Sequence, residues 1–131
     1  MRPFACDMIL IEDRKILLVK RGREPEKGKW VLPGGRIDED ETAEKCLLRE
    51  MKEETGLVVE PTKLVGIYSD PKRDPRKIIA AAYIVEKVSG RLKAGDDAAD
   101  AKWFSLRNMP ELGFDHKKIV ADALKIILFQ A

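Results

Sequence analysis

Hydrophobic positions along the chain gather in short runs that charged or turn-forming residues interrupt, a pattern typical of a sheet with connecting loops. Residues 4–11 and 15–20 are apolar-rich and are separated only by Glu12-Asp13-Arg14, so we expect them to form a β-hairpin. Further strand-like runs are 30–32, 64–68, 78–88 and 101–106. The first of these is expected to stop at the Pro-Gly-Gly that follows it.

Two segments have helical periodicity. Thr42 is suited to cap a helix that runs to about Thr55, and Gly56 then occupies the position just past the helix end, where glycine is favoured. A last helix is expected near Asp115, because apolar residues recur at helical spacing after it: Ile119, Val120, Ala123, Ile126 and Ile127. The order of strands, helix, strands and helix predicts an α/β (α+β) arrangement with a mixed central sheet, in one domain over residues 1–131.

Composition narrows the classes of protein. The chain has 131 residues, of which 44% are hydrophobic and 37% charged, so a core under a charged surface is available and disorder is excluded. The longest apolar run, 78–85, is far shorter than the roughly twenty residues of a membrane span. Asp7 comes before any long apolar stretch, which argues against a secretory signal, so we expect a cytoplasmic protein with Cys6 and Cys46 reduced and buried.

Charge is balanced overall but unevenly distributed. The formal net charge is +2, without the basic excess of a protein that binds nucleic-acid backbone, so we expect no nucleic-acid partner. Residues 38–54 contain eight acids against three bases, whereas residues 72–77 contain four bases against one acid. This separation suits a metal ion at the first segment and an anionic ligand at the second. A heavily charged composition is also found in heat-adapted proteins.

Three acids share one side of the first helix. Glu50, Glu53 and Glu54 have i, i+3 and i, i+4 spacing, and the opposite side is expected to hold Leu47, Leu48 and Met51. Like charges at this spacing cost an isolated helix only about 0.2–0.5 kcal/mol per pair, so a solvated acidic face is one interpretation. The alternative is a divalent cation, since clustered carboxylate oxygens suit Mg²⁺ or Mn²⁺.

The sequence around these acids favours the second interpretation. Gly35 is followed after five residues by Glu41 and, after seven more, by Arg-Glu-Met-Lys-Glu-Glu-Thr-Gly-Leu over residues 49–57. This resembles, without a mismatch, the Nudix box G-x5-E-x7-R-E-U-x-E-E-x-G-U, in which U is a bulky aliphatic residue. Seven fixed residues and two aliphatic ones match a given window by chance roughly once in 10⁹. The hairpin before the box and the Trp103-Phe104 pair before the final helix fit as well, so the resemblance covers the whole chain.

The resemblance implies a Nudix α/β/α sandwich that hydrolyses a nucleoside diphosphate linked to another moiety, with a divalent metal. Glu50 and Glu54 are then the principal metal ligands, and Glu53 is a further ligand or the catalytic base. Gly35, with its neighbouring glycine, allows a tight bend that can leave a carbonyl facing the metal. Arg49 holds the acids in place and partly neutralises them.

Two further acids are assigned less directly. Glu41 precedes the helix, and we expect a structural bond to Arg49 or to the loop in preference to a metal role. The family usually has one more acid before the last strand, as metal ligand or base, and Asp97 is the candidate. The alternative is that Gly95-Asp96-Asp97 only forms a turn. The single histidine, His116, is expected to cap or pack and to have no catalytic role.

The segment 69–76, Ser-Asp-Pro-Lys-Arg-Asp-Pro-Arg, bears on the substrate. It is similar to the Ser-x-Pro-x-Arg-Asp-Pro-Arg segment of Nudix ADP-ribose pyrophosphatases, in which a proline marks the subgroup. Pro71 stiffens the loop, Arg73 and Arg76 offer bidentate donors to phosphate, and Arg36 is a further expected substrate contact. A rigid surface loop without a ligand is the alternative. The chain continues with Lys-Ile-Ile-Ala at 77–80, where members of the subgroup have a His and a Ser.

The expected reaction is therefore hydrolysis of ADP-ribose to AMP and ribose 5-phosphate with Mg²⁺ or Mn²⁺. The alternatives are a pyrophosphatase for nucleoside triphosphates such as oxidised nucleotides, and a catalytically silent nucleotide-binding sensor. The resemblance implies a small-molecule nucleotide as partner, no membrane, and, since many relatives form homodimers, a homodimer.

Overall fold

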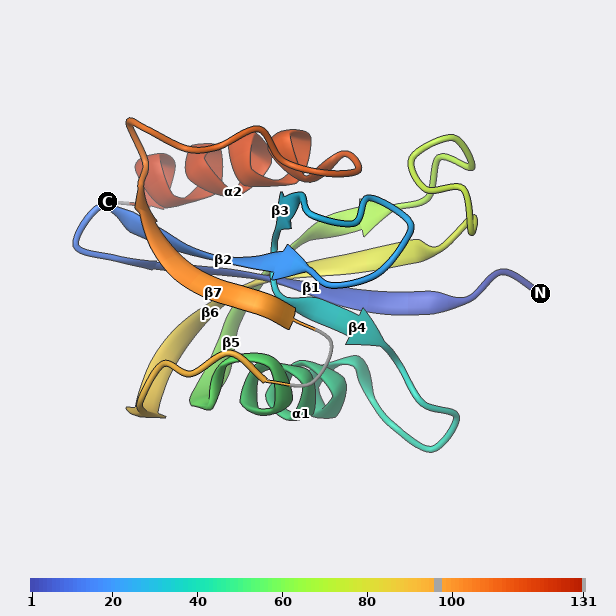
Figure 1. Ribbon diagram of the computed structural model, residues 1–131, viewed down its shortest axis with the longest axis horizontal. Coiled ribbons are helices and arrows are strands. Elements are labelled where there is room, and N and C mark those ends of the chain that lie inside the picture. Colours follow the sequence, from blue (N-terminus) through green and yellow to red (C-terminus); the bar gives the residue numbers. More distant parts are fainter. Residues whose placement is uncertain (96–97, 131) are drawn as a thin grey trace.

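The computed structural model describes residues 1–95 and 98–130, as a sheet with one helix on each face (Figure 1). The elements, in chain order, are β1 (Phe4–Glu12), β2 (Lys15–Arg21), β3 (Trp30–Val31), β4 (Gly34–Arg36), α1 (Ala43–Thr55), β5 (Leu57–Tyr68), β6 (Ile79–Gly90), β7 (Ala98–Ser105) and α2 (His116–Gln130). Among the described residues, no helix has the length and apolar content that crossing a membrane requires.

The described strands form one mixed sheet with β1 near its centre. The main path runs β3-β2-β1-β6-β5, while β4 pairs with β1 and β7 pairs with β2. Of the pairs formed between the described strands β1–β7, only β1–β6 is parallel, and the others are antiparallel. The expected hairpin is confirmed as β1 and β2, which meet at Ile11 opposite Ile16.

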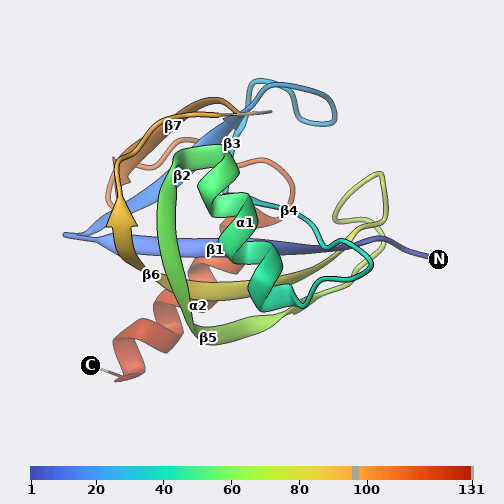
Figure 2. The same ribbon diagram turned by 90° about the horizontal axis from the view of Figure 1, so that it is seen from below.

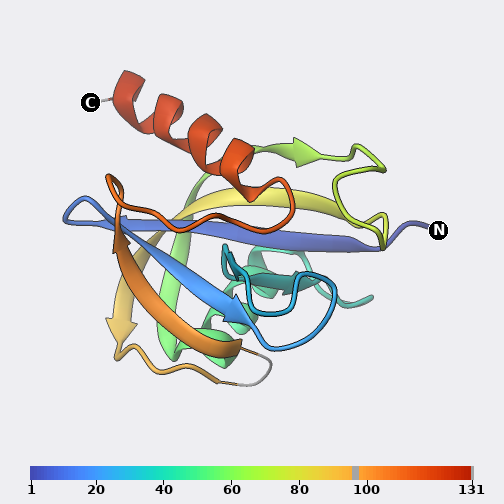
Figure 3. The same cartoon turned by 45° about the horizontal axis from the view of Figure 1, so that its top comes forward.

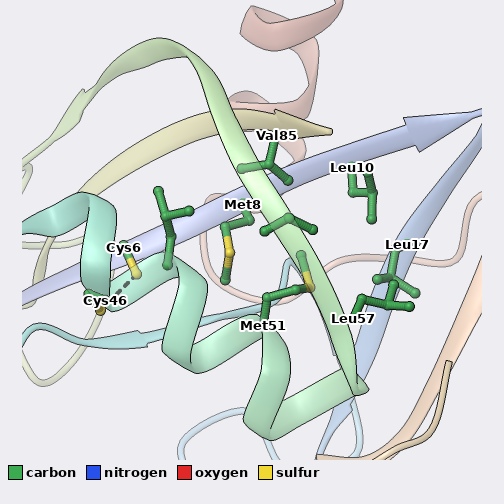
Figure 4. Close-up of a cluster of buried hydrophobic side chains, with 10 residues drawn as sticks. Cys6, Met8, Leu10, Leu17, Cys46, Met51, Leu57 and Val85 are labelled. Atoms are coloured by element: carbon green, nitrogen blue, oxygen red, sulfur yellow. Dashed lines mark hydrogen bonds between the residues drawn. The ribbon is translucent and has the colours of Figure 1, made fainter. Parts of the chain in front are cut away.

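Strand β1 supplies both cores, because successive side chains of a strand point to opposite faces. Cys6, Met8 and Leu10 pack with Met51 and other residues under α1, as Figure 4 shows. Ile9, on the other face, packs with α2. Figure 2 shows α1 in front of the sheet and α2 behind it. The expected α/β/α sandwich with a mixed sheet is therefore confirmed.

The first helix begins and ends where its capping residues predict. The Thr42 side chain accepts a hydrogen bond from the Lys45 amide at 3.1 Å, and Gly56 adopts a left-handed conformation at φ 76°. Of the three residues that the spacing places opposite the acids, Leu47 and Met51 are fully buried, whereas Leu48 is 40% exposed. Cys46 takes the inner position instead, and its Sγ lies 2.9 Å from the Sγ of Cys6, both as free thiols.

Two strand predictions need correction. Gly34 and Gly35 do not simply end a strand, because they form β4, which pairs with Asp7 and Cys6 of β1. The strand expected at 64–68 begins seven residues earlier, at Leu57. A proline within it, Pro61, is tolerated because β5 lies at the sheet edge and its pairing with β6 shifts register there.

Candidate active site

The candidate site is a cavity of about 650 Å³ at the end of the sheet where β1 begins. Figure 3 shows that the β2–β3 loop and the β5–β6 loop lie toward this end. One wall carries Glu50, Glu53 and Glu54 of α1 beside β4. The basic side chains that line it are Lys20, Arg21, Arg23, Arg36, Arg73 and Arg76. Acidic and basic side chains therefore line the same cavity, although they come from segments far apart in the sequence.

The acidic wall depends on close contact between α1 and β4. The Gly34 amide donates a hydrogen bond to Glu54 Oε1 at 3.2 Å. A Cβ on Gly35 would lie only 2.2 Å from the carboxyl carbon of Glu50, so this position accepts glycine alone while Glu50 keeps its place. The Gly35 carbonyl oxygen lies 3.6 Å from Cys46 Sγ. The structure thus gives Gly35 a reason beyond the expected bend, which is to leave room for a carboxylate.

Glu50 and Glu54 form a pair of interacting carboxyl groups. Burial raises the pKa of Glu50 and raises that of Glu54 well above its usual value, and the charge on Glu50 raises the Glu54 pKa further. Among the residues that the structure describes, no three His, Cys, Asp or Glu side chains form a ready metal cluster. Two adjacent, desolvated carboxylates nevertheless fit a hard divalent cation, whose charge offsets their repulsion.

Arg49 connects Glu41 to two acids of the acidic wall, Glu50 and Glu53. Its Nε and Nη2 donate to the two oxygens of Glu41 at 2.7 and 2.8 Å, and Nη2 also donates to the Arg36 carbonyl. Its Nη1 donates to Glu50 at 2.7 Å and to Glu53 at 3.2 Å. The expected bond between Glu41 and Arg49 is confirmed. Arg49 lowers the pKa of Glu41 to about 2, so Glu41 remains ionised and keeps the guanidinium oriented.

In the basic loop, residues 69–76, Arg73 and Pro71 lie differently from what the sequence predicts. Arg73 was expected to offer two donors to phosphate, but its side chain is 4% exposed and donates to both oxygens of Asp115, at 2.9 and 2.7 Å, and to the Ile78 carbonyl. Its two parallel donors already have a carboxylate partner, which ties the loop to the start of α2. Pro71 is exposed and does not contribute to the cavity wall.

Two other arginines have more freedom toward the cavity. The Arg76 guanidinium pairs with Asp74 at 2.9 Å, is one-third exposed, and lies 5.4 Å from the centre of the Phe114 ring. Arg36 is exposed and lines the cavity. The remaining candidate, Asp97, lies outside the described residues.

The structure adds residues that the sequence reasoning did not place in the site. The Phe114 ring lies near both Arg21 and Arg76, with cation–ring distances of 5.3 and 5.4 Å. Asp7 lies on the cavity floor beside His116, and burial raises the pKa of Asp7 while lowering that of His116. A single acid inside the apolar run 4–11 was the available signal for Asp7, whereas only tertiary contact brings Phe114 to the site.

Comparisons with known proteins agree with this geometry. The NUDIX domain model matches residues 1–123. An ADP-ribose pyrophosphatase of Methanocaldococcus jannaschii is 48% identical over 122 residues, 92% of this chain and 72% of that protein. The NUDIX domain of Shewanella oneidensis NrtR, solved with ADP ribose, superposes with a TM-score of 0.85 at 28% identity, over 97% of this chain and 89% of that one.

A further solved structure contains a metal ion. It is a bifunctional NMN adenylyltransferase/ADP ribose pyrophosphatase from Francisella tularensis, complexed with AMP and a Mn ion, at a TM-score of 0.82 and 26% identity. The similarity covers 95% of this chain and 42% of that protein. Sequence, fold and the acidic wall therefore agree that this chain belongs to the NUDIX family, as a pyrophosphohydrolase that acts on nucleoside diphosphate derivatives.

Proposed function

We propose that this protein hydrolyses ADP-ribose to AMP and ribose 5-phosphate with Mg²⁺ or Mn²⁺. The observation that carries the proposal is the single cavity in which the Glu50–Glu54 pair faces Arg36 and Arg76. A diphosphate needs a cation on one side and fixed positive charge on the other, and the cavity offers ligands for the first and supplies the second. The 48% identity to an ADP-ribose pyrophosphatase supports this choice of substrate.

The metal-holding roles follow the acidic wall. Glu50 and Glu54 are the carboxylates that would hold the cation, beside the backbone at Gly35. When bound, the cation supplies polarisation of the diphosphate. Glu53, the exposed member of the set, accepts the proton of the attacking water or completes the ligand set. We also assign Asp97 to this group as a second candidate base.

The arginines divide into two roles. Arg49, bonded to Glu41, Glu50 and Glu53, orients the acids and limits their repulsion. Arg76 and Arg36 face the cavity and would bind the diphosphate. Arg73 acts indirectly, since it fixes the loop that carries Arg76 through its contact with Asp115.

The sequence-based expectations for domain and partner complete the proposal. Residues 1–131 would act as one domain on a small-molecule nucleotide, and a homodimer is the expected assembly. Light scattering coupled to gel filtration measures the assembly, and a monomer at micromolar concentration would contradict that part alone.

The test is a substrate panel. Purified protein is incubated with ADP-ribose, with ATP, dATP and 8-oxo-dGTP, and with ADP-glucose, each with Mg²⁺, with Mn²⁺ and with excess EDTA, and products are separated by ion-exchange chromatography. We expect the highest kcat/KM for ADP-ribose, with AMP as product, and no turnover in EDTA. A higher kcat/KM for a triphosphate would replace the proposed substrate, and binding of ADP-ribose without turnover would favour a sensor.

A further inference from the structure

One buried acid in the cavity has no part in the roles assigned above. Asp7 lies on β1, on the same face as Ile9, which packs in the core under α2. The strand alternation would place an apolar side chain at position 7, yet the residue is a carboxylate that is only 8% exposed. Burying a charge without close partners costs stability, so an acid at this position needs a physical explanation.

The neighbours of Asp7 do not use its full capacity as an acceptor. His116 Nδ1 accepts a hydrogen bond from the Leu32 amide at 3.0 Å, so a neutral imidazole carries its proton on Nε2, 3.5 Å from Asp7 Oδ2. The Arg73 Nη2 atom lies 3.9 Å from the same oxygen and has its short bond to Asp115. Within residues 1–95 and 98–130, no hydrogen bond to the Asp7 carboxylate meets ordinary distance and angle limits.

The position of Asp7 favours a ligand group that donates a hydrogen bond. A phosphate would be repelled by the carboxylate, and the arginines around the cavity suit it better. A metal ion at Asp7 would face the guanidinium of Arg73 and the imidazole N–H of His116. The walls beside Asp7 include the small side chains of Ala5 and Ala80, which leave room for a ring.

We propose that Asp7 is a specificity-determining residue, whose carboxylate accepts a hydrogen bond from an amino or hydroxyl group of the nucleotide substrate. The inference rests on the proposed function, because it assigns a role within the same cavity. The donor is the amino group of the base or a hydroxyl group of either ribose, two sources with the same hydrogen-bonding chemistry. With a substrate that lacks that donor, Asp7 stays desolvated and unpaired, so the enzyme stabilises the transition state of that substrate less well.

The experiment removes the donor and the acceptor separately and together. Wild type, Asp7→Ala and Asp7→Asn are assayed with ADP-ribose and with analogues that lack, one at a time, the base amino group, a hydroxyl of the adenosine ribose, or a hydroxyl of the terminal ribose. We expect wild type to prefer ADP-ribose over one analogue by roughly ten- to a hundredfold in kcat/KM, the value of a lost charge-assisted hydrogen bond. Asp7→Ala should lose activity on ADP-ribose and little on that analogue.

The controls separate specificity from structure. Asp7→Asn keeps the shape and one acceptor, so it should retain part of the preference even if Asp7→Ala folds poorly. Asp13→Asn neutralises an exposed acid in the turn after the same strand and should leave every ratio unchanged. An equal loss on all substrates in both Asp7 variants, or a wild type with no preference among the analogues, would overturn the inference.

Failure of the proposed substrate gives a different result. If wild type hydrolyses triphosphates and not ADP-ribose, the ADP-ribose proposal is wrong, and the pairs ATP with ITP and ATP with dATP remove the same kinds of donor. A preference within either pair that Asp7→Ala removes would still support the role of Asp7, and its persistence in the variant would refute that role.

Discussion

Replacing Gly35 with alanine is expected to damage the site while leaving the fold intact. The new Cβ would lie 2.2 Å from the carboxyl carbon of Glu50 and 2.4 and 2.5 Å from its two oxygens. Ordinary van der Waals contact begins at 3.4 Å, so the carboxyl carbon must move by about 1.2 Å. Since the obstacle is the end of a flexible side chain, Glu50 can rotate away and β4 can keep its pairing with β1.

The magnitude follows from that displacement. A misplacement of about 1 Å in a catalytic arrangement can cost about 10²-fold in rate, equivalent to roughly 2.7 kcal/mol of transition-state stabilisation. Loss of one positioned carboxylate should also weaken metal binding, and disturbed supporting groups usually lower metal affinity or activity 10- to 100-fold. We therefore expect Gly35→Ala to lower kcat/KM for ADP-ribose by about 10²-fold and to raise the Mg²⁺ concentration needed for half-maximal rate.

The adjacent glycine provides the matched control. A Cβ on Gly34 would lie 2.2 Å from the backbone carbonyl oxygen of Cys6, which cannot rotate away. Gly34→Ala should therefore disturb the β1–β4 pairing and lower the melting temperature measured in EDTA, whereas Gly35→Ala should leave it within a few degrees of wild type. The reasoning is refuted if Gly35→Ala has wild-type kcat/KM and Mg²⁺ dependence, or if it destabilises the protein as much as Gly34→Ala does.

Four further variants test other parts of the site. Glu54→Gln should lower kcat by about 10²–10⁴-fold, the range for a lost positioned carboxylate, without lowering the melting temperature in EDTA, because one of two repelling groups is neutralised; a wild-type kcat would contradict its role. Arg76→Ala should lower kcat/KM for ADP-ribose roughly ten- to a hundredfold at unchanged stability. Arg73→Ala should instead lower the free energy of unfolding in urea by up to about 3–5 kcal/mol, because it leaves Asp115 unpaired. The reverse pattern would exchange the roles of the two arginines. Burial lowers the pKa of His116, so as the pH drops the unfolded chain takes up the proton first, and the free energy of unfolding should begin to fall below about pH 6.5. In urea titrations from about pH 7.5 to 5.5, His116→Gln should lack this pH-dependent loss of stability. The same pH dependence in His116→Gln and wild type would argue against a contribution from His116.

Local sequence determined the elements whose signals lie within a few residues of each other. Thr42 and Gly56 bound α1 because capping depends only on the adjacent turn of backbone. The same helical spacing places Glu50 and Glu54 one turn apart, and the two carboxyls do interact in the folded chain. The β1–β2 hairpin likewise followed from two apolar runs and a short turn.

Leu48 shows where helical periodicity stops being sufficient. The spacing alone allows the buried stripe to be centred on Leu47 and Leu48 or on Cys46 and Leu47. Which stripe is buried depends on the strands that α1 contacts, and here β1 brings Cys6 opposite Cys46. No local signal distinguishes these two rotations of the helix, so the spacing groups Leu48 with Leu47 and Met51 although only the latter two are buried.

Only the tertiary structure decided the partners of groups that are distant in the sequence. Arg73 binds Asp115, which is 42 residues away, so the charge of Arg73 stabilises the loop. The basic composition of that loop had instead suggested that Arg73 binds phosphate. His116 accepts a hydrogen bond from Leu32, 84 residues away, and this contact helps to bring α2 to the cavity floor. The sequence thus determined which chemical groups are present and which local elements carry them. The sheet order decided which of those groups pair with each other and which, such as Asp7, are left facing the cavity, because burial and pairing depend on contacts that local periodicity does not encode.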